Sequence, residues 1–249
     1  MKKLLLSAAV IAAAMGVNAQ VTFGGHAGAN FASAELKDES SNPTTTEKYK
    51  TKVGFIVGAV AEIELGNGLS FRPELNFIQK GGKAKISETN SGTGFTSTTT
   101  GEAEFSLGYI QLSPNFIYNF EAGSGKFFVG AGPDISFGLG GKYKGNIKST
   151  TTINFPGLPA TTNTTNDNFD SKVKFDGKEN ATDDNVHLKS LDFGVNGLVG
   201  YKLANGAFIS AGYTVGLSNI SPEDKTSFKN SGFNVKIGFM FGGSGKSKE

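Results

Sequence analysis

Hydrophobic and polar residues alternate along eight segments of this 249-residue chain. The segments comprise residues 21–32, 52–65, 69–80, 105–120, 126–140, 188–203, 207–218 and 232–241. Strict alternation is typical of β-strands with two different faces, whereas an amphipathic helix repeats its apolar positions every three to four residues. No long segment shows the helical repeat, so the pattern predicts an all-β protein.

The two faces of each predicted strand differ in chemistry. In the last segment Phe233, Ile237 and Phe239 share one face, whereas Asn234 and Lys236 share the other. A soluble barrel or sandwich would bury the apolar face and a membrane barrel would turn it to lipid, and alternation alone permits both. The opposite face is rich in Gly, Ser and Asn with isolated charges, which suits the crowded interior of a small barrel better than a soluble surface. We therefore expect the apolar face to lie on the outside of the barrel, in contact with lipid.

The connections between the segments alternate in length. Tight connections at residues 66–68, 121–125 and 204–206 are separated by long ones, of which the longest spans residues 141–187. Outer-membrane barrels have an even number of antiparallel strands, with tight turns in the periplasm and long loops outside. The sequence thus predicts an eight-stranded antiparallel transmembrane β-barrel with short periplasmic turns and long extracellular loops.

Turn chemistry and aromatic positions support this prediction. Asn67-Gly68 and Asn205-Gly206 suit type I′ turns, because both central residues of that turn need positive φ. Aromatic residues gather at the presumed periplasmic strand ends, as in an interfacial girdle. They are Tyr118, Phe120, Phe127, Tyr201 and Phe241.

The first residues have the form of an export signal. Lys2 and Lys3 precede a short apolar run, and small residues follow it, so we expect a signal peptide at residues 1–19, cleaved between Ala19 and Gln20. The barrel domain then covers residues 20–241, and residues 242–249 form a flexible C-terminal tail. Lys2 and Lys3 account for the formal net charge of +2, so the mature chain is neutral and lacks the basic footprint of a nucleic-acid binder.

The chain contains no cysteine, which excludes disulfides, a lipoprotein anchor and thiolate metal sites. We expect a monomer that is integral to the outer membrane, contacts its lipid, and has both termini in the periplasm.

Several strands resemble those of a known family. Residues 69–81 carry the run LSFRPELNFIQKG, residues 109–118 read YIQLSPNFIY, and residues 23–31 read FGGHAGANF. These stretches resemble the small outer-membrane barrels described as porin-family or PorT-like, which are similar in architecture to OmpA- and OmpX-type barrels. The resemblance covers essentially the whole mature chain. It implies the fold and the location, and a PorT-like relationship would imply a partner in secretion machinery.

The polar face predicts a charged interior. Its charged members are Glu62, Arg72, Glu74, Asp134, Asp192, Lys202 and Lys236. Arg72 is the only arginine of the chain, and a guanidinium among carboxylates can bridge strands with charge-assisted hydrogen bonds. We interpret these residues as a structural network that fills the lumen. A small selective pore is the alternative.

Residues for catalysis or metal binding are sparse. The two histidines are His26, expected to face inward, and His187, which precedes Ser190 and Asp192 near the presumed outer rim. Small barrels that modify lipid can place such a trio at the rim, but a triad is defined by geometry that spacing does not show. We expect no catalytic residues, no cofactor and no metal.

Acidic and amide residues in the longest connection resemble a calcium loop only in part. They are Asn166, Asp167, Asn168, Asp170, Asp183 and Asp184. The glycine and the terminal glutamate of an EF-hand loop are missing, so we expect a solvated loop.

The long loops predict interaction surfaces. Ile153, Phe155 and Leu158 form an apolar cluster beside Pro156 and Pro159, which is either a partner-binding tip or the packed centre of a large loop. In another loop, one hairpin register that pairs Asn76 with Gln111 also places Lys83 opposite Glu104 and Lys85 opposite Glu102. That register predicts a ribbon that protrudes above the membrane.

Three functions remain open at this stage. The first is an integral barrel with a structural, envelope-integrity or surface-interaction role, whose partner is a surface protein or secretion machinery. The second is a small passive diffusion porin. The third is a lipid-modifying barrel enzyme.

Overall fold

The alternating segments form antiparallel strands, as their two-sided pattern predicts. The computed structural model describes residues 21–40, 44–179 and 182–241. Its strands are β1 (Val21–Asp38), β2 (Thr45–Gly66), β3 (Leu69–Gly92), β4 (Phe95–Ala122), β5 (Gly125–Ile153), β6 (Thr161–Lys174), β7 (Val186–His187), β8 (Leu191–Leu203), β9 (Ala207–Gly216) and β10 (Thr226–Phe241). The signal peptide, the Ala19–Gln20 junction and the tail at 242–249 lie outside these described residues.

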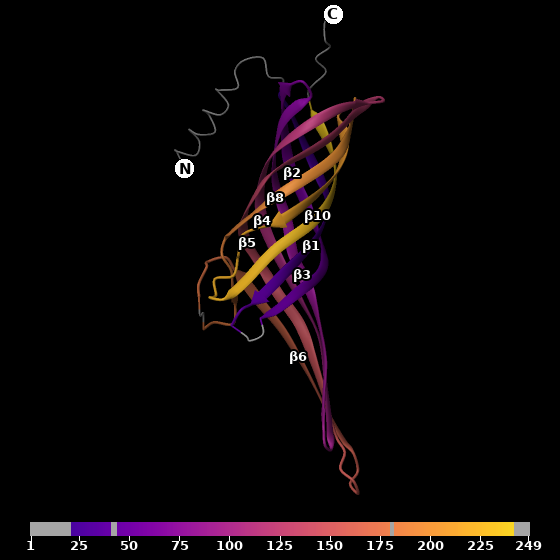
Figure 1. Cartoon of the computed structure of the whole chain (residues 1–249), viewed down its shortest axis with the longest axis vertical. Coiled ribbons are helices and arrows are strands. Elements are labelled where there is room, and N and C mark those ends of the chain that lie inside the picture. Colours follow the sequence, from indigo (N-terminus) through magenta and orange to yellow (C-terminus); the bar gives the residue numbers. More distant parts are fainter. Residues whose placement is uncertain (1–20, 41–43, 180–181, 242–249) are drawn as a thin grey trace, which may run out of the picture.

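Eight of the strands close into a ring. Strands β1 to β5 pair in sequence, β5 then pairs with β8, and β8, β9 and β10 lead back to β1. The seam between β1 and β10 runs in continuous register from Phe23 opposite Phe241 to Asp38 opposite Thr226. The predicted eight-stranded antiparallel barrel is therefore confirmed, and β6 and β7 lie outside the ring (Figure 1).

Tight turns join the strands at one end, which we call the short-turn end. Asn67 and Gly68 have φ of 53° and 80°, which confirms the type I′ turn predicted there. The prediction for Asn205-Gly206 is wrong, because among the described non-glycine residues only Asn67 and Lys225 have positive φ. Here the Gly206 N–H donates to the Leu203 carbonyl, Gly206 has φ of 93°, and the Asn205 side chain accepts from the Ala207 N–H. This is a three-residue loop with a left-handed glycine.

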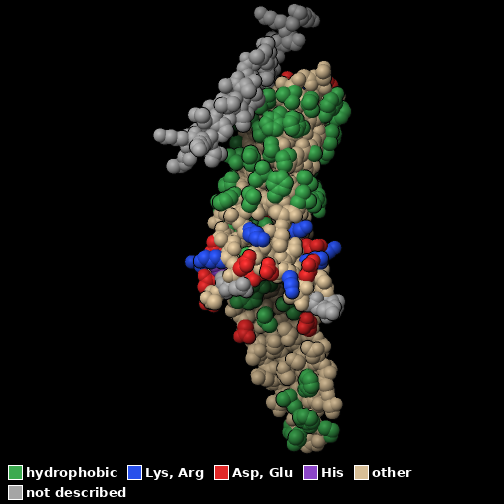
Figure 2. Space-filling model, turned by 60° about the vertical axis from the view of Figure 1, so that its left-hand side comes forward, with side chains coloured by type: hydrophobic (Ala, Val, Ile, Leu, Met, Phe, Trp, Pro, Cys, Tyr) green, Lys and Arg blue, Asp and Glu red, His purple; other side chains and the backbone are tan. Residues whose placement is uncertain are grey.

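Apolar side chains cover the outside of the ring and polar side chains fill it. Phe55, Leu75 and Ile237 are 47%, 54% and 65% exposed, while Arg72 and Asn76 are almost fully enclosed. Figure 2 shows this apolar surface on one face of the barrel, with Lys, Asp and Glu gathered below it, toward the narrow end of the molecule. The inverted arrangement, with these apolar residues in a soluble core, is therefore excluded. The described residues contain no helix long and apolar enough to cross a membrane.

At the other end, β3, β4 and β5 continue far beyond the barrel, and β6 pairs with the projecting part of β5. This projecting sheet, which we call the stalk, consists of residues 81–92 of β3, 95–107 of β4, 141–153 of β5 and 161–173 of β6. It tapers away from the barrel along the long axis of the molecule (Figure 1). The register that opposes Lys83 with Glu104 and Lys85 with Glu102 is present, with Nζ–Oε distances of 3.2 and 2.6 Å, so the predicted ribbon is confirmed.

The sequence pattern underestimated the ordered part of the long connections. Residues 141–187 were expected to form a single solvated loop, but residues 141–153 extend β5, and β6 pairs with them. Within β6, Asp167 and Asp170 point to opposite faces because neighbouring side chains of a strand alternate. Asp170 instead pairs with Lys144 at 3.0 Å. The described residues hold no group of three or more His, Cys, Asp or Glu arranged to bind a metal.

Candidate functional site

The interior of the barrel contains all seven charged residues that the polar face predicted there. Six are at most 5% exposed, namely Glu62, Arg72, Glu74, Asp134, Asp192 and Lys236. The side chain of Lys202 is 16% exposed. The structure separates them into two layers, one near the short-turn end and one in the middle of the barrel.

The layer near the short-turn end, here the arginine layer, consists of Glu62, Arg72, Glu74, Lys202 and Lys236. Arg72 Nη1 donates to Glu62 Oε2 at 3.1 Å, and Lys202 Nζ donates to Glu62 Oε1 at 2.6 Å. Lys236 Nζ donates to Glu74 Oε2, and Glu74 Oε1 lies 3.5 Å from Arg72 Nε. These contacts join β2, β3, β8 and β10 across the lumen, with two of the five side chains, Arg72 and Glu74, coming from β3.

Aromatic rings enclose the guanidinium of Arg72. Its Cζ lies 4.7 Å from the centroid of the Phe128 ring and 4.6 Å from that of Phe208. A guanidinium stacks on aromatic faces more readily than an ammonium does. The two rings therefore fill the barrel cross-section on either side of the ion pairs.

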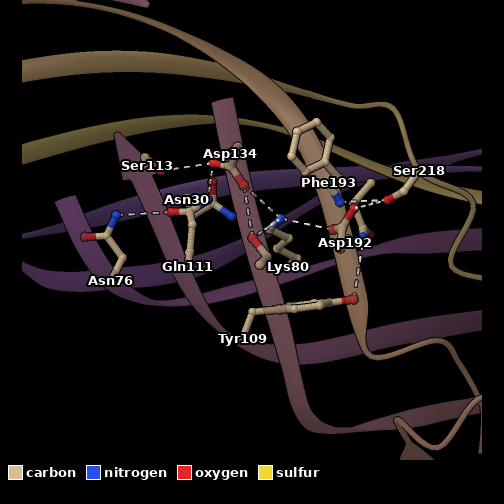
Figure 3. Close-up of polar contacts among 12 residues, drawn as sticks. Asn30, Asn76, Lys80, Tyr109, Gln111, Ser113, Asp134, Asp192, Phe193 and Ser218 are labelled. Atoms are coloured by element: carbon tan, nitrogen blue, oxygen red, sulfur yellow. Dashed lines mark hydrogen bonds and ion pairs between the residues drawn. The ribbon is translucent and has the colours of Figure 1, made fainter. Parts of the chain in front are cut away.

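The middle layer, here the lysine layer, is built around Lys80 (Figure 3). Lys80 Nζ donates to Asp192 Oδ2 at 3.0 Å and to Ser136 Oγ at 2.9 Å, and it lies 3.8 Å from Asp134 Oδ1. Gln111 donates to Asp134 Oδ2 at 2.6 Å. Lys80 was absent from the predicted interior set, although it continues the even-numbered polar face of Arg72, Glu74 and Asn76 by the same alternation.

A chain of amides links His26 to the lysine layer. His26 Nε2 and Asn76 Oδ1 are 2.7 Å apart, so the ring nitrogen donates, and Asn76 Nδ2 donates to Gln111 Oε1 at 3.1 Å. Gln111 then reaches Asp134, as described above. This chain extends the lysine layer as far as His26, whose Nδ1 has no hydrogen-bond partner among the described residues.

The charges of the two layers compensate each other. The arginine layer has three cations, Arg72, Lys202 and Lys236, against Glu62 and Glu74. The lysine layer has Lys80 against Asp134 and Asp192. Four cations therefore face four carboxylates. A balanced interior of this kind provides neither a cation nor an anion with an attractive path.

Above the lysine layer the interior becomes apolar, which the polar-face pattern did not predict. This apolar plug contains the buried residues Ala34, Tyr49, Ile56, Ile78, Leu107, Tyr109, Val173, Leu188, Ile220 and Phe228. Leu188 and Ile220 come from loops that fold inward, and backbone hydrogen bonds hold them: the Lys189 N–H donates to the Ile220 carbonyl at 2.8 Å. A cavity lined by Asn30, Lys80 and Gln111 measures about 10 Å³, room for one water at most.

His187 holds the loop that carries Leu188. Its Nδ1 lies 2.6 Å from Asp176 Oδ1 and its Nε2 lies 2.7 Å from Asp183 Oδ1. The hydrogen bonds to Asp183 and Asp176 raise the pKa of His187, because they favour the imidazolium form, which donates from both nitrogens. Lys174 also pairs with Asp183 at 2.7 Å.

The rim trio considered from the sequence does not assemble among the described residues. His187 bonds to Asp176 and Asp183, whereas Asp192 accepts from Lys80, Ser218 and Asn230. Asp192 is a component of the lysine layer, so its carboxylate is already committed there.

The apolar loop cluster lies at the far end of the stalk. Ile153, Phe155 and Leu158 are 44%, 48% and 66% exposed, and Phe95, at 45%, sits opposite Ile153 in the register. Figure 2 shows an apolar patch at the narrow end of the molecule, away from the apolar surface of the barrel. Sequence reasoning missed Phe95, since it is the single aromatic residue in a Ser/Thr/Gly run.

These features together define a transmembrane β-barrel: a closed ring, apolar outside, with a hydrogen-bonded interior. Residues 15–222 match the family model described as "Outer membrane protein beta-barrel domain". The chain belongs to this outer-membrane protein family and is an integral outer-membrane protein.

Solved structures similar to the chain include other small barrels. Neisserial surface protein A is 15% identical, with a TM-score of 0.36, and the match covers 89% of this chain and 99% of that one. Ail, the attachment invasion locus protein of Yersinia pestis, was solved with the heparin analogue sucrose octasulfate, and it is 11% identical with a TM-score of 0.32 over 88% of this chain and 99% of Ail. At this distance the likeness concerns the fold alone. A search of curated proteins finds no match.

Proposed function

We propose that this protein is a non-conducting outer-membrane barrel that holds the stalk outside the cell for contact with another surface. In this arrangement the short-turn end and both termini face the periplasm, as in outer-membrane barrels generally. The observation that carries the proposal is the filled lumen: two ion-paired layers and the apolar plug occupy it in series. The barrel therefore serves as an anchor, and the stalk is the part available to partners.

The build of the stalk supports this role. Strands β3, β4 and β5 run from the barrel wall into the stalk, and β6 pairs with β5 there. The sheet of the stalk is therefore continuous with the membrane anchor. Binding elements are characteristically carried on loops that a rigid scaffold positions. The pairing of β3 with β4 runs without a register shift from Leu69 in the barrel to Gly92 at the end of the stalk, so the stalk is directly continuous with its anchor.

The first test is electrical. The purified chain in a planar bilayer should give no steady conductance steps, because the plug and both polar layers would have to move to open a path. Steady, reproducible steps in the wild-type chain would overturn the closed lumen and favour the passive diffusion porin.

The second test removes the stalk. In a shortened variant, residues 87–100 and residues 148–166 are each replaced by Asn-Gly, a pair that suits two-residue hairpin loops. Cells displaying the full chain should be retained on at least one of three surfaces: a lawn of cells, protein-coated glass or a supported lipid bilayer. The shortened variant should lose this retention while keeping its barrel. Equal retention of both chains would contradict a contact role for the stalk.

A further inference from the structure

The end of the stalk has an unusual composition for an exposed loop. Four large apolar side chains, Phe95, Ile153, Phe155 and Leu158, gather there at 44–66% exposure, and we call them the tip. They belong to two neighbouring turns, since the Asn154 N–H donates to the Gly94 carbonyl at 2.8 Å. The apolar barrel surface lies at the opposite end of the molecule (Figure 2).

The tip is held in its exposed arrangement. A Cβ added to Gly94 would lie 2.4 Å from the Phe155 ring, and one added to Gly92 would lie 2.3 Å from the Phe95 ring, so each ring rests on glycine backbone. The Leu158 N–H donates to the Phe155 carbonyl at 3.1 Å. Because the rings are supported from below, the tip cannot relieve its exposure by collapsing inward.

A broad uncharged collar surrounds the tip. In the pairing register the charged residues nearest the tip on β3, β5 and β6 are Glu88, opposite Thr99; Lys148, opposite Thr100; and Asp167, opposite Ile147. On β4 the nearest is Glu102. Thr99 is four residues along β4 from Phe95, which corresponds to about 13 Å at the rise of a strand. Side chains that lie in a membrane interface reach about 5–10 Å into it. The collar is deep enough to enter with the tip without burying a charge.

The collar is polar, but its hydroxyls bond to one another across the sheet. Thr152 and Thr162 are 3.0 Å apart, and Ser97 and Thr151 are 3.1 Å apart. Hydroxyls that already have a partner lose less on leaving water than free ones do. Such a collar is compatible with the headgroup region of a bilayer.

The size and shape of the tip distinguish between the surfaces that could bind it. Four large side chains, each about half exposed, offer on the order of 400 Å² at about 200 Å² for each complete side chain. A stable protein–protein interface needs about 800 Å² per partner. The tip also projects beyond the stalk, so a protein partner or a second copy would have to supply a matching concavity. A lipid surface needs neither the area nor the concavity.

The bilayer that holds the barrel is out of reach of the tip. The charged row of Lys83 and Glu104 lies at the base of the stalk, and Gly92 is nine residues farther along β3, about 30 Å at the rise of a strand. From these observations we propose that the tip inserts into the surface of a second, apposed phospholipid bilayer. The inference rests on the proposed function, which places the stalk outside the cell, and it identifies the contacted surface as lipid.

The test uses the absence of tryptophan from the chain. Phe155→Trp places one fluorescent indole at the tip of the full chain, which is held in a tryptophan-free amphipathic polymer. Phosphatidylcholine vesicles should shift its emission to the blue, and vesicles with acyl chains brominated near the headgroup should quench it. Because the collar is uncharged, high salt should not change the result.

Two matched variants give the comparison. Ile86→Trp lies on the same stalk, where Ile86 is 37% exposed, but outside the tip, and its emission should change with neither vesicle. Ile153→Ser with Leu158→Ser in the Phe155→Trp chain should weaken vesicle binding at least tenfold. Unchanged Phe155→Trp emission with both vesicles overturns the inference. A blue shift that needs no vesicles and grows with protein concentration also overturns it, since a second copy then covers the tip.

The outcomes separate this inference from the proposed function. If the shortened variant loses surface retention but Phe155→Trp is not quenched, the stalk makes contacts by another route and only the lipid inference fails. If Phe155→Trp is quenched but retention is the same for both chains, the tip inserts in lipid and the contact role of the stalk fails.

Discussion

Arg72 illustrates how one residue organises the interior of a small barrel. It is fully enclosed, it faces two carboxylates, and two rings cover its guanidinium. Its Nη2 has no hydrogen-bond partner among the described residues, as is also true of His26 Nδ1. An unsatisfied buried donor destabilises a fold, so the ion pairs and the ring contacts must outweigh it.

The first prediction concerns the carboxylate that faces Arg72. Glu62→Gln removes the carboxylate that pairs with both Arg72 and Lys202 and leaves these two cations enclosed without it. Loss of one partner of a buried ion pair lowers the free energy of unfolding by about 3–5 kcal/mol. Urea titration of the folded barrel would measure the change. Lys85→Ala is the control, because its exposed pair with Glu102 contributes about 1 kcal/mol or less, and similar losses in both variants would contradict a structural role for the arginine layer.

The second prediction concerns the pH dependence of the loop that His187 holds. The pKa of His187 is raised above its ordinary value of 6.5, so its contribution to holding the loop is complete below pH 6.5 and is lost as the pH rises through the raised pKa. Amide hydrogen exchange at Leu188 and Lys189, corrected for its intrinsic pH dependence, should accelerate over that rise. His187→Gln should abolish the step. Protection that stays constant through the alkaline range would show that the His187 contacts with Asp176 and Asp183 do not depend on the imidazolium.

At the scale of the strand, the sequence is informative where the two faces differ. The membrane segments alternate between lipid-facing and lumen-facing residues, so their positions and faces were predictable, as in residues 69–80. The hairpin register followed from placing Asn76 opposite Gln111, which also opposes Lys83 with Glu104. Strand β6 could not be found in this way, because Thr, Asn and Ser occupy both of its faces and leave no alternation to detect. The inward placement of Leu188 and Ile220 also depends on loop folding that no periodicity encodes.

The third prediction tests the charged rows of the stalk. Lys83→Glu with Lys85→Glu places like charges opposite Glu104 and Glu102, and each lost pair contributes about 0.2–1 kcal/mol. The base of the stalk should open more often, and limited proteolysis should cut it faster. Adding Glu102→Lys restores the pair at position 85 and should recover part of the original resistance, whereas Glu104 is left unchanged because it also lies 3.5 Å from Lys52. Cleavage at the wild-type rate in the first variant would show that backbone pairing alone holds the stalk.

At the scale of the molecule, the fold depends on closing β1 against β10. Gly28 lies at this seam with its missing side chain directed at the neighbouring strand, where a Cβ would lie 1.9 Å from the Val235 carbonyl oxygen and 2.8 Å from the Lys236 Cα. Gly25 lies on the same strand, but a Cβ there would meet only the Gly58 carbonyl oxygen, at 3.7 Å. A larger side chain therefore fits at Gly25 but not at Gly28.

The fourth prediction uses this pair to test closure. Closed barrels resist SDS until heated, so the wild-type chain should migrate differently on gels with and without boiling. Gly28→Val should prevent closure of the seam and abolish the shift, because backbone atoms on β10 cannot move aside without breaking the ladder. Gly25→Val adds an apolar side chain where space is available and should keep the shift. If Gly28→Val also kept it, the β1–β10 register would differ from the one described, and the placement of Lys236 in the arginine layer would fail with it.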